Sequence, residues 1–294
     1  MNATHAALAN HVAFLNGRGE MPMLEVLTRW SSAEIYLHGA HVTHFQKQGE
    51  PPLLFTSQCS RFEPQAPIRG GIPIVFPWFG QPPGRPYRHG FARLRDWGLS
   101  ELATELDGSL RLRFRMPECE EGPDCPACAV EYELVVRDSL RAELTVTNQS
   151  DRAFRFELCL HTYLLVGNVN QTWITGLQGT EYLDATAGFQ RQYDPAETLR
   201  IQGEVDRIYL NTTHPVEVHD PELGRTLRIE KTGSASTIVW NPGAAKAKEM
   251  PDFGDDEYLQ MICIESGNVA DNALTLPPGA TTTMQILLNS RPGV

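Results

Sequence analysis

Apolar and polar residues alternate one by one along many short stretches of this chain. Residues 110–115 read Leu-Arg-Leu-Arg-Phe-Arg, which would place Leu110, Leu112 and Phe114 on one face and three arginines on the other. Successive side chains of a β-strand point to opposite faces of its sheet. This stretch therefore predicts a strand with one buried and one exposed face.

Similar runs recur along the chain and favour an all-β fold. Turn-forming clusters such as Pro82-Pro83-Gly84 and Pro277-Pro278-Gly279 separate them, and no long stretch has a helical period of 3.6 residues. We expect one antiparallel β-sandwich domain over residues 1–294, with few short helices and with residues 1–10 flexible. The further expected strands are 23–29, 33–37, 130–137, 141–147, 154–161, 172–176, 208–211, 226–230, 236–240, 259–265 and 282–289.

The six cysteines indicate a reducing compartment. They form no regular framework, and Cys159 and Cys263 lie in apolar runs, where buried free thiols are common. We therefore predict a cytoplasmic protein, and no window has the roughly 18 apolar residues of a membrane-spanning helix. A zinc site at Cys119, Cys125 and Cys128 would need a fourth ligand from elsewhere, so we interpret this stretch as a turn that carries thiols. We predict no metal and no cofactor.

Cationic residues gather between Pro64 and Arg95. This segment contains His89 and five arginines, without any acidic residue, in a chain whose formal net charge is -11. The overall field repels polyanions, so nucleic acid and anionic membranes are unfavourable partners. Short-range guanidinium contacts suit a phosphate-sized ligand. The alternative is a solvated cationic loop, because surface arginines are common. The five arginines are Arg69, Arg85, Arg88, Arg93 and Arg95.

Two of the expected strands carry ionisable residues that are hard to explain by structure alone. In 154–161, four apolar residues share one face, which places His161 on the other face with Arg155, Glu157 and Cys159. In 259–265, Glu265 would end a largely apolar row, where a carboxylate is costly unless it is hydrogen-bonded or catalytic. The alternatives are a structural histidine at the end of a strand and a terminal acid that reaches solvent.

Seven sequence blocks between residues 68 and 266 resemble the D-hexose-6-phosphate mutarotases, also called glucose-6-phosphate 1-epimerases, a group within the aldose 1-epimerase-like superfamily. The blocks occur in the order of that family, and the flanking strand patterns extend the resemblance over nearly the whole chain. The resemblance implies a galactose-mutarotase-like β-supersandwich that holds a sugar on a concave face. The blocks are Ile68–Gly80, Arg88–Arg93, Leu160–Tyr163, Gly203–Tyr209, Val239–Pro242, Asp252–Tyr258 and Ile262–Ser266.

The resemblance also implies roles for individual residues. Interconversion of the α and β anomers removes the proton of the anomeric hydroxyl and protonates the ring oxygen, so that the ring opens and closes on the other face. Glu265 would be the base and His161 the acid, with their roles reversed on closure. His89 and Asp206 would orient the sugar.

The resemblance further implies residues that bind the phosphate group, and the sequence departs from the family pattern at two positions. Arg69 and Arg93 match the positions that bind the 6-phosphate, and Arg88, where the family has a smaller or neutral residue, would add a contact or point outward. Gly243 stands where the family has an aromatic residue, which leaves the preferred hexose open.

We therefore expect an enzyme that acts on small-molecule hexose 6-phosphates as a monomer, without nucleic acid or membrane partners. Two alternatives remain. One is a non-catalytic sugar-phosphate binding protein on the same scaffold. The other is an aldose 1-epimerase for neutral hexoses, which would need no arginine cluster.

Overall fold

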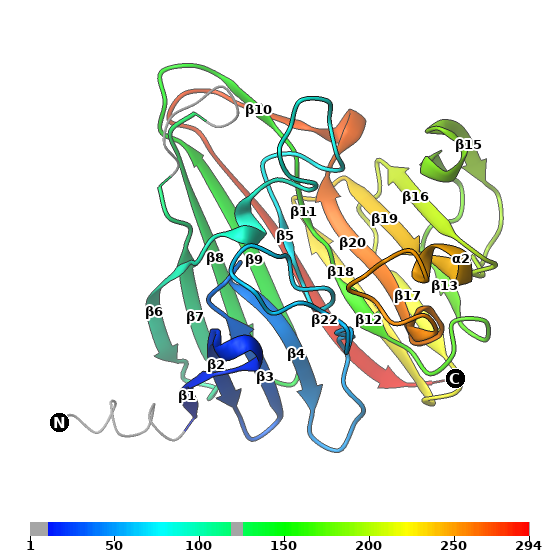
Figure 1. Ribbon diagram of the computed structural model, residues 1–294, viewed down its shortest axis with the longest axis horizontal. Coiled ribbons are helices and arrows are strands. Elements are labelled where there is room, and N and C mark those ends of the chain that lie inside the picture. The colour runs from blue at the N-terminus through cyan, green and yellow to red at the C-terminus, as the bar shows by residue number, and fades with distance from the viewer. Residues whose placement is uncertain (1–10, 119–125, 294) are drawn as a thin grey trace.

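The computed structural model describes residues 11–118 and 126–293. Figure 1 shows two large β-sheets that lie against each other, with a smaller sheet near the N-terminus. The expected flexible segment 1–10 and the cysteines Cys119 and Cys125 lie outside the described residues. Throughout the described part of the chain, the named strands pair in antiparallel fashion, which confirms the predicted fold class.

The first large sheet contains β20 and β11 as neighbouring strands. Its outer strands β14 and β15 form a hairpin, and β12 adds to β20 beside β11. Its strands, in spatial order, are β15 (Gln190–Asp194), β14 (Thr180–Asp184), β16 (Val205–Leu210), β19 (Ser236–Asn241), β20 (Met261–Asn268), β11 (Leu158–Leu160) and β5 (Ile74–Val75), with β12 (Tyr163–Leu165) paired to β20.

The second large sheet supports the first. Its strand β7 alternates as predicted, since Leu110, Leu112 and Phe114 are buried while the arginines between them reach the surface. Its strands, in spatial order, are β13 (Trp173–Thr175), β17 (Val216–Asp220), β18 (Arg225–Thr232), β22 (Thr281–Pro292), β9 (Leu140–Asn148), β8 (Cys128–Val136), β7 (Leu110–Arg115) and β6 (Gly98–Thr104).

The remaining regular elements of the described residues are two smaller sheets and a few short helices. The four-stranded sheet contains β1 (Val12–Asn16), β2 (Pro22–Leu27), β3 (Ser31–Tyr36) and β4 (His41–Lys47), and β10 (Phe154–Phe156) pairs with β21 (Leu274–Leu276). The helical elements are α2 (Gly243–Ala247) and the 3-10 turns η1 (Arg18–Glu20), η2 (Ala92–Leu94), η3 (Ala185–Ala187), η4 (Glu257–Gln260) and η5 (Ala270–Asn272).

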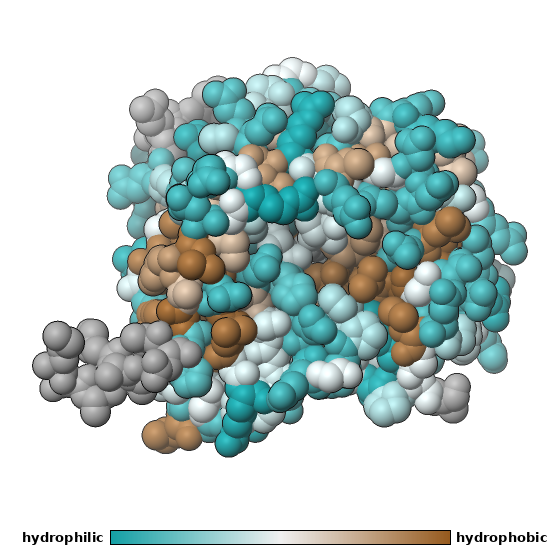
Figure 2. Space-filling view, turned by 60° about the horizontal axis from the view of Figure 1, so that its bottom comes forward, coloured by the Kyte–Doolittle hydropathy of each residue, from teal (hydrophilic) through white to brown (hydrophobic). Residues whose placement is uncertain are grey.

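The main core joins residues from the four-stranded sheet and both large sheets. Leu24 of β2, Tyr132 of β8 and Ile264 of β20 all belong to this one buried cluster. Burial of such apolar surface is the dominant favourable contribution to folding. Figure 2 shows one face of the molecule, on which hydrophobic residues form separate areas within a mostly hydrophilic surface. Among residues 11–118 and 126–293, no helix is long and apolar enough to cross a membrane.

Two predicted strands differ from the structure. The run 154–161 is not one strand, because β10 ends at Phe156 in the two-stranded sheet and β11 begins at Leu158 in a large sheet. The run 259–265 begins in η4 instead, and β20 continues to Asn268, so Glu265 lies inside a strand and not at its end. Alternation of side chains survives the break at Glu157, which explains why the predicted faces are still correct.

Candidate active site

One cavity brings together all of the residues predicted to act on or bind the substrate. It encloses about 670 Å³ of space, including open solvent at its mouth. The predicted residues that line it are Arg69, Arg88, His89, Arg93, His161, Asp206 and Glu265, and the further lining residues are Phe79, Tyr163, Trp240, Lys246 and Met250.

Register across the first large sheet builds the floor of this cavity. Asp206 lies opposite Trp240, Trp240 opposite Cys263, and Cys263 opposite Tyr163. Residues directly opposite each other in a sheet point to the same face. Glu265 lies two residues beyond Cys263 in β20 and therefore shares that face.

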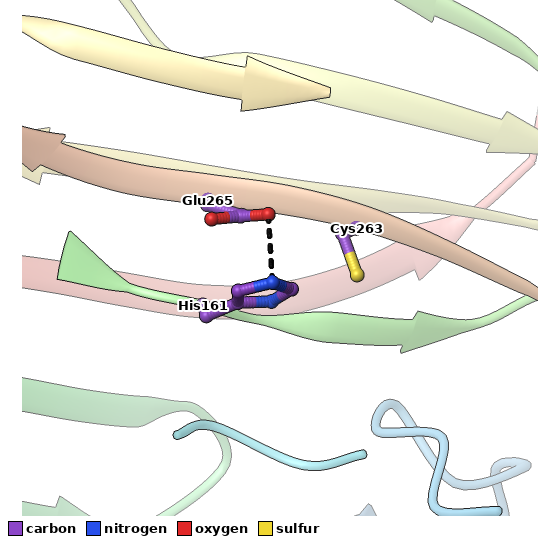
Figure 3. A group of neighbouring side chains, drawn as sticks. All are labelled: His161, Cys263 and Glu265. Atoms are coloured by element: carbon purple, nitrogen blue, oxygen red, sulfur yellow. Dashed lines mark ion pairs between the residues drawn. The ribbon is translucent and has the colours of Figure 1, made fainter. Parts of the chain in front are cut away.

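His161 and Glu265 are in direct contact. The distance from His161 Nε2 to Glu265 Oε1 is 3.1 Å, and Figure 3 shows the imidazole and the carboxyl group facing each other. Only 6% of His161 and 1% of Glu265 are exposed to solvent. The Cys159 thiol donates a hydrogen bond to Glu265 Oε2 at a distance of 3.6 Å. Burial excludes the alternative of a terminal acid that reaches solvent.

Burial also changes the proton affinities of this pair. Desolvation, followed by the charges of Arg93 and Arg69, holds the pKa of His161 well below its ordinary value. Desolvation, followed by the nearby Asp206 carboxylate, raises the pKa of Glu265 well above its ordinary value. Both shifts favour a neutral imidazole beside a protonated carboxyl over an ion pair, because separated charges are costly in a buried site.

Aromatic rings hold the imidazole of His161. Its ring stacks on Tyr163 with a centroid distance of 4.8 Å and an interplanar angle of 13°, and it meets the edge of Trp240 at 6.2 Å. Packing on two sides fixes the orientation of the ring, which proton transfer requires. His161 Nδ1 is buried, and no other residue of the described chain forms a hydrogen bond with it.

Arg69 is held in place by an acidic loop. Its guanidinium group donates to both carboxylate oxygens of Asp252, with a shortest distance of 3.0 Å, and to the Tyr163 hydroxyl at 3.1 Å. Gly70 and Gly71 follow with φ angles of 129° and 59°, and a Cβ atom at Gly71 would lie 2.1 Å from the carbonyl oxygen of Val42. Only glycine allows this close backbone approach.

Arg93 is a buried cation in η2. It is 7% exposed, it donates to the carbonyl oxygen of Arg88 at 2.6 Å, and its Nε has no partner. Desolvation and then the charge of Arg69 lower the pKa of Arg93 to about 10. The guanidinium group therefore stays charged at neutral pH, and among the described residues it forms no ion pair with a carboxylate.

His89 faces two N–H groups. Gly80 donates its backbone N–H to Nδ1, and Arg88 Nε lies against Nε2, both at 3.2 Å. Burial, followed by the charge of Arg93, lowers the pKa of His89 well below its ordinary value, and a neutral imidazole has only one acceptor nitrogen. The two hydrogen bonds therefore cannot form together. Arg88 is exposed, so it is the partner that can move away when Nε2–H donates to a ligand.

Lys246 is a cavity residue that the sequence analysis missed. It lies in α2 and forms an ion pair with Glu204 at 2.5 Å. Glu204 is two residues before Asp206, and burial is the main cause that raises the pKa of Asp206. Gly243 begins α2 with a φ of 63°, and a Cβ atom there would lie 2.6 Å from the backbone nitrogen of Glu204. With this backbone an aromatic side chain at position 243 could not be accommodated.

Tyr163 and Asp252 were also not predicted as site residues. Both lie inside the quoted sequence blocks, but a tyrosine in a strand and an acidic loop have ordinary structural explanations. Their partner Arg69 is far away in sequence, so no local pattern identifies the contact.

His161, Cys263 and Glu265 form one group with the atom types of metal ligands. One potential ligand atom from each lies within 4.8 Å of the others. Figure 3 shows the three side chains as neighbours. The charges of Arg69 and Arg93 act on the same imidazole and oppose a bound cation. We therefore assign no metal to this group.

Comparison with known proteins agrees with this geometry. A protein from Cenchrus ciliaris named "Putative glucose-6-phosphate 1-epimerase" is 33% identical over 270 residues, covering 88% of this chain and 82% of its own length. A protein from Escherichia coli (strain K12) with the same name is 28% identical over 241 residues, covering 81% of this chain and 80% of its own length.

Solved structures and a family profile extend this agreement. The crystal structure of "a putative mutarotase (YeaD)" from Salmonella typhimurium superposes with a TM-score of 0.86 at 23% identity, covering 98% of this chain and 99% of that one. This likeness shows that the fold is shared. The aldose 1-epimerase profile matches residues 26–289. The chain therefore belongs to the aldose 1-epimerase family.

Proposed function

We propose that this enzyme interconverts the α and β anomers of hexose 6-phosphates. Glu265 accepts the proton of the anomeric hydroxyl while His161 donates a proton to the ring oxygen, which opens the ring. After rotation about the C1–C2 bond, the two residues exchange roles and the ring closes. The anomeric and ring oxygens are bonded to the same carbon, so an acid and a base that already touch each other suit these two targets.

The other cavity residues bind and orient the sugar in this proposal. Arg69 and Arg93 hold the phosphate, since guanidinium groups match phosphate oxygens in charge and geometry. His89 donates to the ring-oxygen side through Nε2–H, Asp206 accepts from sugar hydroxyl groups, and Arg88 adds a movable cation at the mouth.

One observation supports this assignment above the others. An acid–base pair in contact at 3.1 Å lines the same cavity as Arg93, a buried arginine for which residues 11–118 and 126–293 supply no carboxylate partner. A site for a neutral hexose would not need the buried cation, whose desolvation is costly unless an anion binds. The names of the similar proteins agree with a phosphorylated substrate.

Anomer-exchange NMR at equilibrium tests the proposal. Exchange rates would be compared for glucose 6-phosphate, galactose 6-phosphate, mannose 6-phosphate and free glucose at equal concentration. We expect the enzyme to accelerate exchange of at least one hexose 6-phosphate well beyond that of free glucose. Equal acceleration of glucose would favour an enzyme for neutral hexoses, and no acceleration of any sugar would favour a binding protein.

We further propose that the chain forms one domain. The main core, which joins β2, β8 and β20, supports this proposal. The monomeric state and the cytoplasmic location stay predictions.

A further inference from the structure

A buried positive charge that forms no ion pair with any described residue lies in the same cavity as the acid–base pair. Arg93 is 7% exposed, and within residues 11–118 and 126–293 its guanidinium group donates one hydrogen bond, to the backbone carbonyl of Arg88. Arg69 shares the cavity with it, and repulsion from Arg69 lowers the proton affinity of Arg93. A desolvated cation of this kind gains most from a bound anion, because Coulomb interactions are strong where water is excluded.

Both guanidinium groups are linked to His161 through aromatic neighbours. Arg69 Nη1 donates to the Tyr163 hydroxyl at 3.1 Å, and the Tyr163 ring stacks on the imidazole at 4.8 Å. Arg93 holds the carbonyl of Arg88, whose side chain contacts His89, and the His89 ring meets the His161 ring at 5.6 Å. The two arginines proposed to bind phosphate are therefore connected to the proton-transfer residue His161 through chains of direct contacts.

The charges around the pair act differently on its two members. Among the charges that act on His161, those of Arg93 and Arg69 come first, and both disfavour a protonated imidazole. Among those that act on Glu265, the charge of Asp206 comes first. The titratable groups that line the cavity or lie next to the pair are Arg69, Arg88, His89, Arg93, Cys159, Tyr163, Asp206, Lys246, Asp252 and Cys263.

We propose that the phosphate of the bound sugar activates the acid: by neutralising Arg69 and Arg93, it draws the proton of the His161–Glu265 pair onto His161. This inference rests on the proposed function and adds that the phosphate promotes the chemical step as well as binding. Binding of an anion at one position and of a proton at another are coupled in both directions.

The proton balance of the pair is closed. In the resting enzyme the proton is bonded to Glu265 Oε1, and His161 Nε2 accepts it in a hydrogen bond. When phosphate binds, the O–H bond breaks as the N–H bond forms, and no proton enters from solvent. The result is an imidazolium that can donate to the ring oxygen and a carboxylate that can accept the anomeric proton. The neutral resting pair has neither group in that form.

NMR of the histidine ring nitrogens tests the proton shift directly. The probe is 1,5-anhydroglucitol 6-phosphate, which has the ring oxygen and the phosphate but no anomeric hydroxyl, and its unphosphorylated form is the matched control. The signal of His161 would be identified by its loss in His161→Gln. At one fixed pH, we expect the phosphorylated probe to raise the ratio of imidazolium to imidazole at His161 about tenfold, equivalent to about one pH unit. An unchanged ratio under saturating probe would overturn the inference.

Activation by a separate anion gives a second test. Inorganic phosphate should raise kcat/KM for free glucose about tenfold, while it competes with glucose 6-phosphate and slows its exchange. The inference is contradicted if inorganic phosphate slows anomer exchange of both sugars, or if it changes the exchange rate of glucose 6-phosphate alone.

Two variants separate activation from simple binding. Arg69→Gln removes one of the opposing charges, so His161 should be more protonated without phosphate and the activation of glucose exchange should shrink. Lys246→Gln is the matched control: the cationic side chains whose charges act on His161 are Arg93, Arg69 and Arg88, so the activation should persist without Lys246. If Arg69→Gln leaves His161 protonation unchanged, the inference fails.

The proposed function has a separate readout. Loss of glucose 6-phosphate exchange in Glu265→Gln would support the acid–base assignment even if phosphate did not shift the proton. Retention of exchange in Glu265→Gln would refute the assignment of Glu265 as the base.

Discussion

Replacement of Cys159 by alanine should shift the pH dependence of catalysis. Cys159 is fully buried in β11 and donates to Glu265 Oε2, the carboxylate oxygen that does not face His161. Burial raises the pKa of the Cys159 thiol well above its ordinary value, so the thiol stays a donor throughout the assay range. A hydrogen bond donated to a carboxylate favours its charged form, and loss of the donor therefore raises the pKa of the carboxyl group.

The size of the shift follows from the weakness of the thiol as a donor. A hydrogen bond of this kind contributes about 1 kcal/mol, and one pKa unit corresponds to about 1.36 kcal/mol. In the resting pair the proton is on Glu265, so the basic limb of kcat/KM for glucose 6-phosphate, where this proton is lost, should move to higher pH by about 0.7 unit. Cys159→Ser keeps a donor and should leave the limb in place or move it to lower pH.

Anomer-exchange NMR from pH 4 to pH 9 would measure this profile, with the folded fraction of each variant checked by thermal unfolding. Cys263→Ala is the matched control, because it also removes a buried thiol beside Glu265 but no hydrogen bond to it is present in the structure. The reasoning is refuted if Cys159→Ala leaves the limb unmoved, or if Cys263→Ala moves it equally.

Three further predictions concern the pair, the phosphate site and a buried lysine. His161→Ala and Glu265→Gln should each lower the exchange rate about 10²- to 10⁴-fold with little loss of sugar binding, because each removes one proton-transfer partner; near-normal exchange in either variant would contradict its role. Arg69→Ala should weaken binding of glucose 6-phosphate about tenfold or more while binding of free glucose changes little. Calorimetric titration with both sugars would measure this, and an equal loss of affinity for the two sugars would contradict the phosphate assignment. Burial lowers the pKa of Lys231 to about 7 from the ordinary 10.5, so unfolding takes up a proton between these values and the free energy of unfolding should rise with pH there. The slope should be at most about 1.4 kcal/mol per pH unit and absent in Lys231→Met, as measured by urea unfolding at several pH values; an equal slope in both proteins would contradict the shift.

The predicted site residues came together because strand alternation is a local property. His161 and Glu265 could each be placed on the correct face from their own neighbours, and the sequence blocks supplied the other five residues. The direct contact between the pair could not be predicted in this way. It depends on the pairing of β11 and β20, strands separated by about a hundred residues, in which Leu160 lies opposite Ser266.

Residues whose roles arise only from distant partners were missed for the same reason. Asp252 lies in a stretch rich in acidic residues, which gives no local indication of its partner, and the structure shows it bound to Arg69 at 3.0 Å. Lys246 lies in a five-residue helix that had no recognisable sequence signal, and it reaches the cavity because Gly243 lets that helix begin against Glu204. The break of the run 154–161 at Glu157 was also missed, since a chain that crosses from one sheet to another keeps its alternation.

The β architecture and the faces of the strands could be predicted from the residue pattern, because backbone geometry sets the two-residue period at each position. Through the resemblance of its blocks to a known family, the sequence also predicts which residues act as acid, base and phosphate ligands, and these roles stay predictions. The three-dimensional arrangement was needed to show that Arg93 is buried with no carboxylate partner among the described residues, that Tyr163 connects Arg69 to His161, and that Cys159 donates to Glu265. These properties depend on burial and on the register between distant strands, which no local pattern of residues specifies.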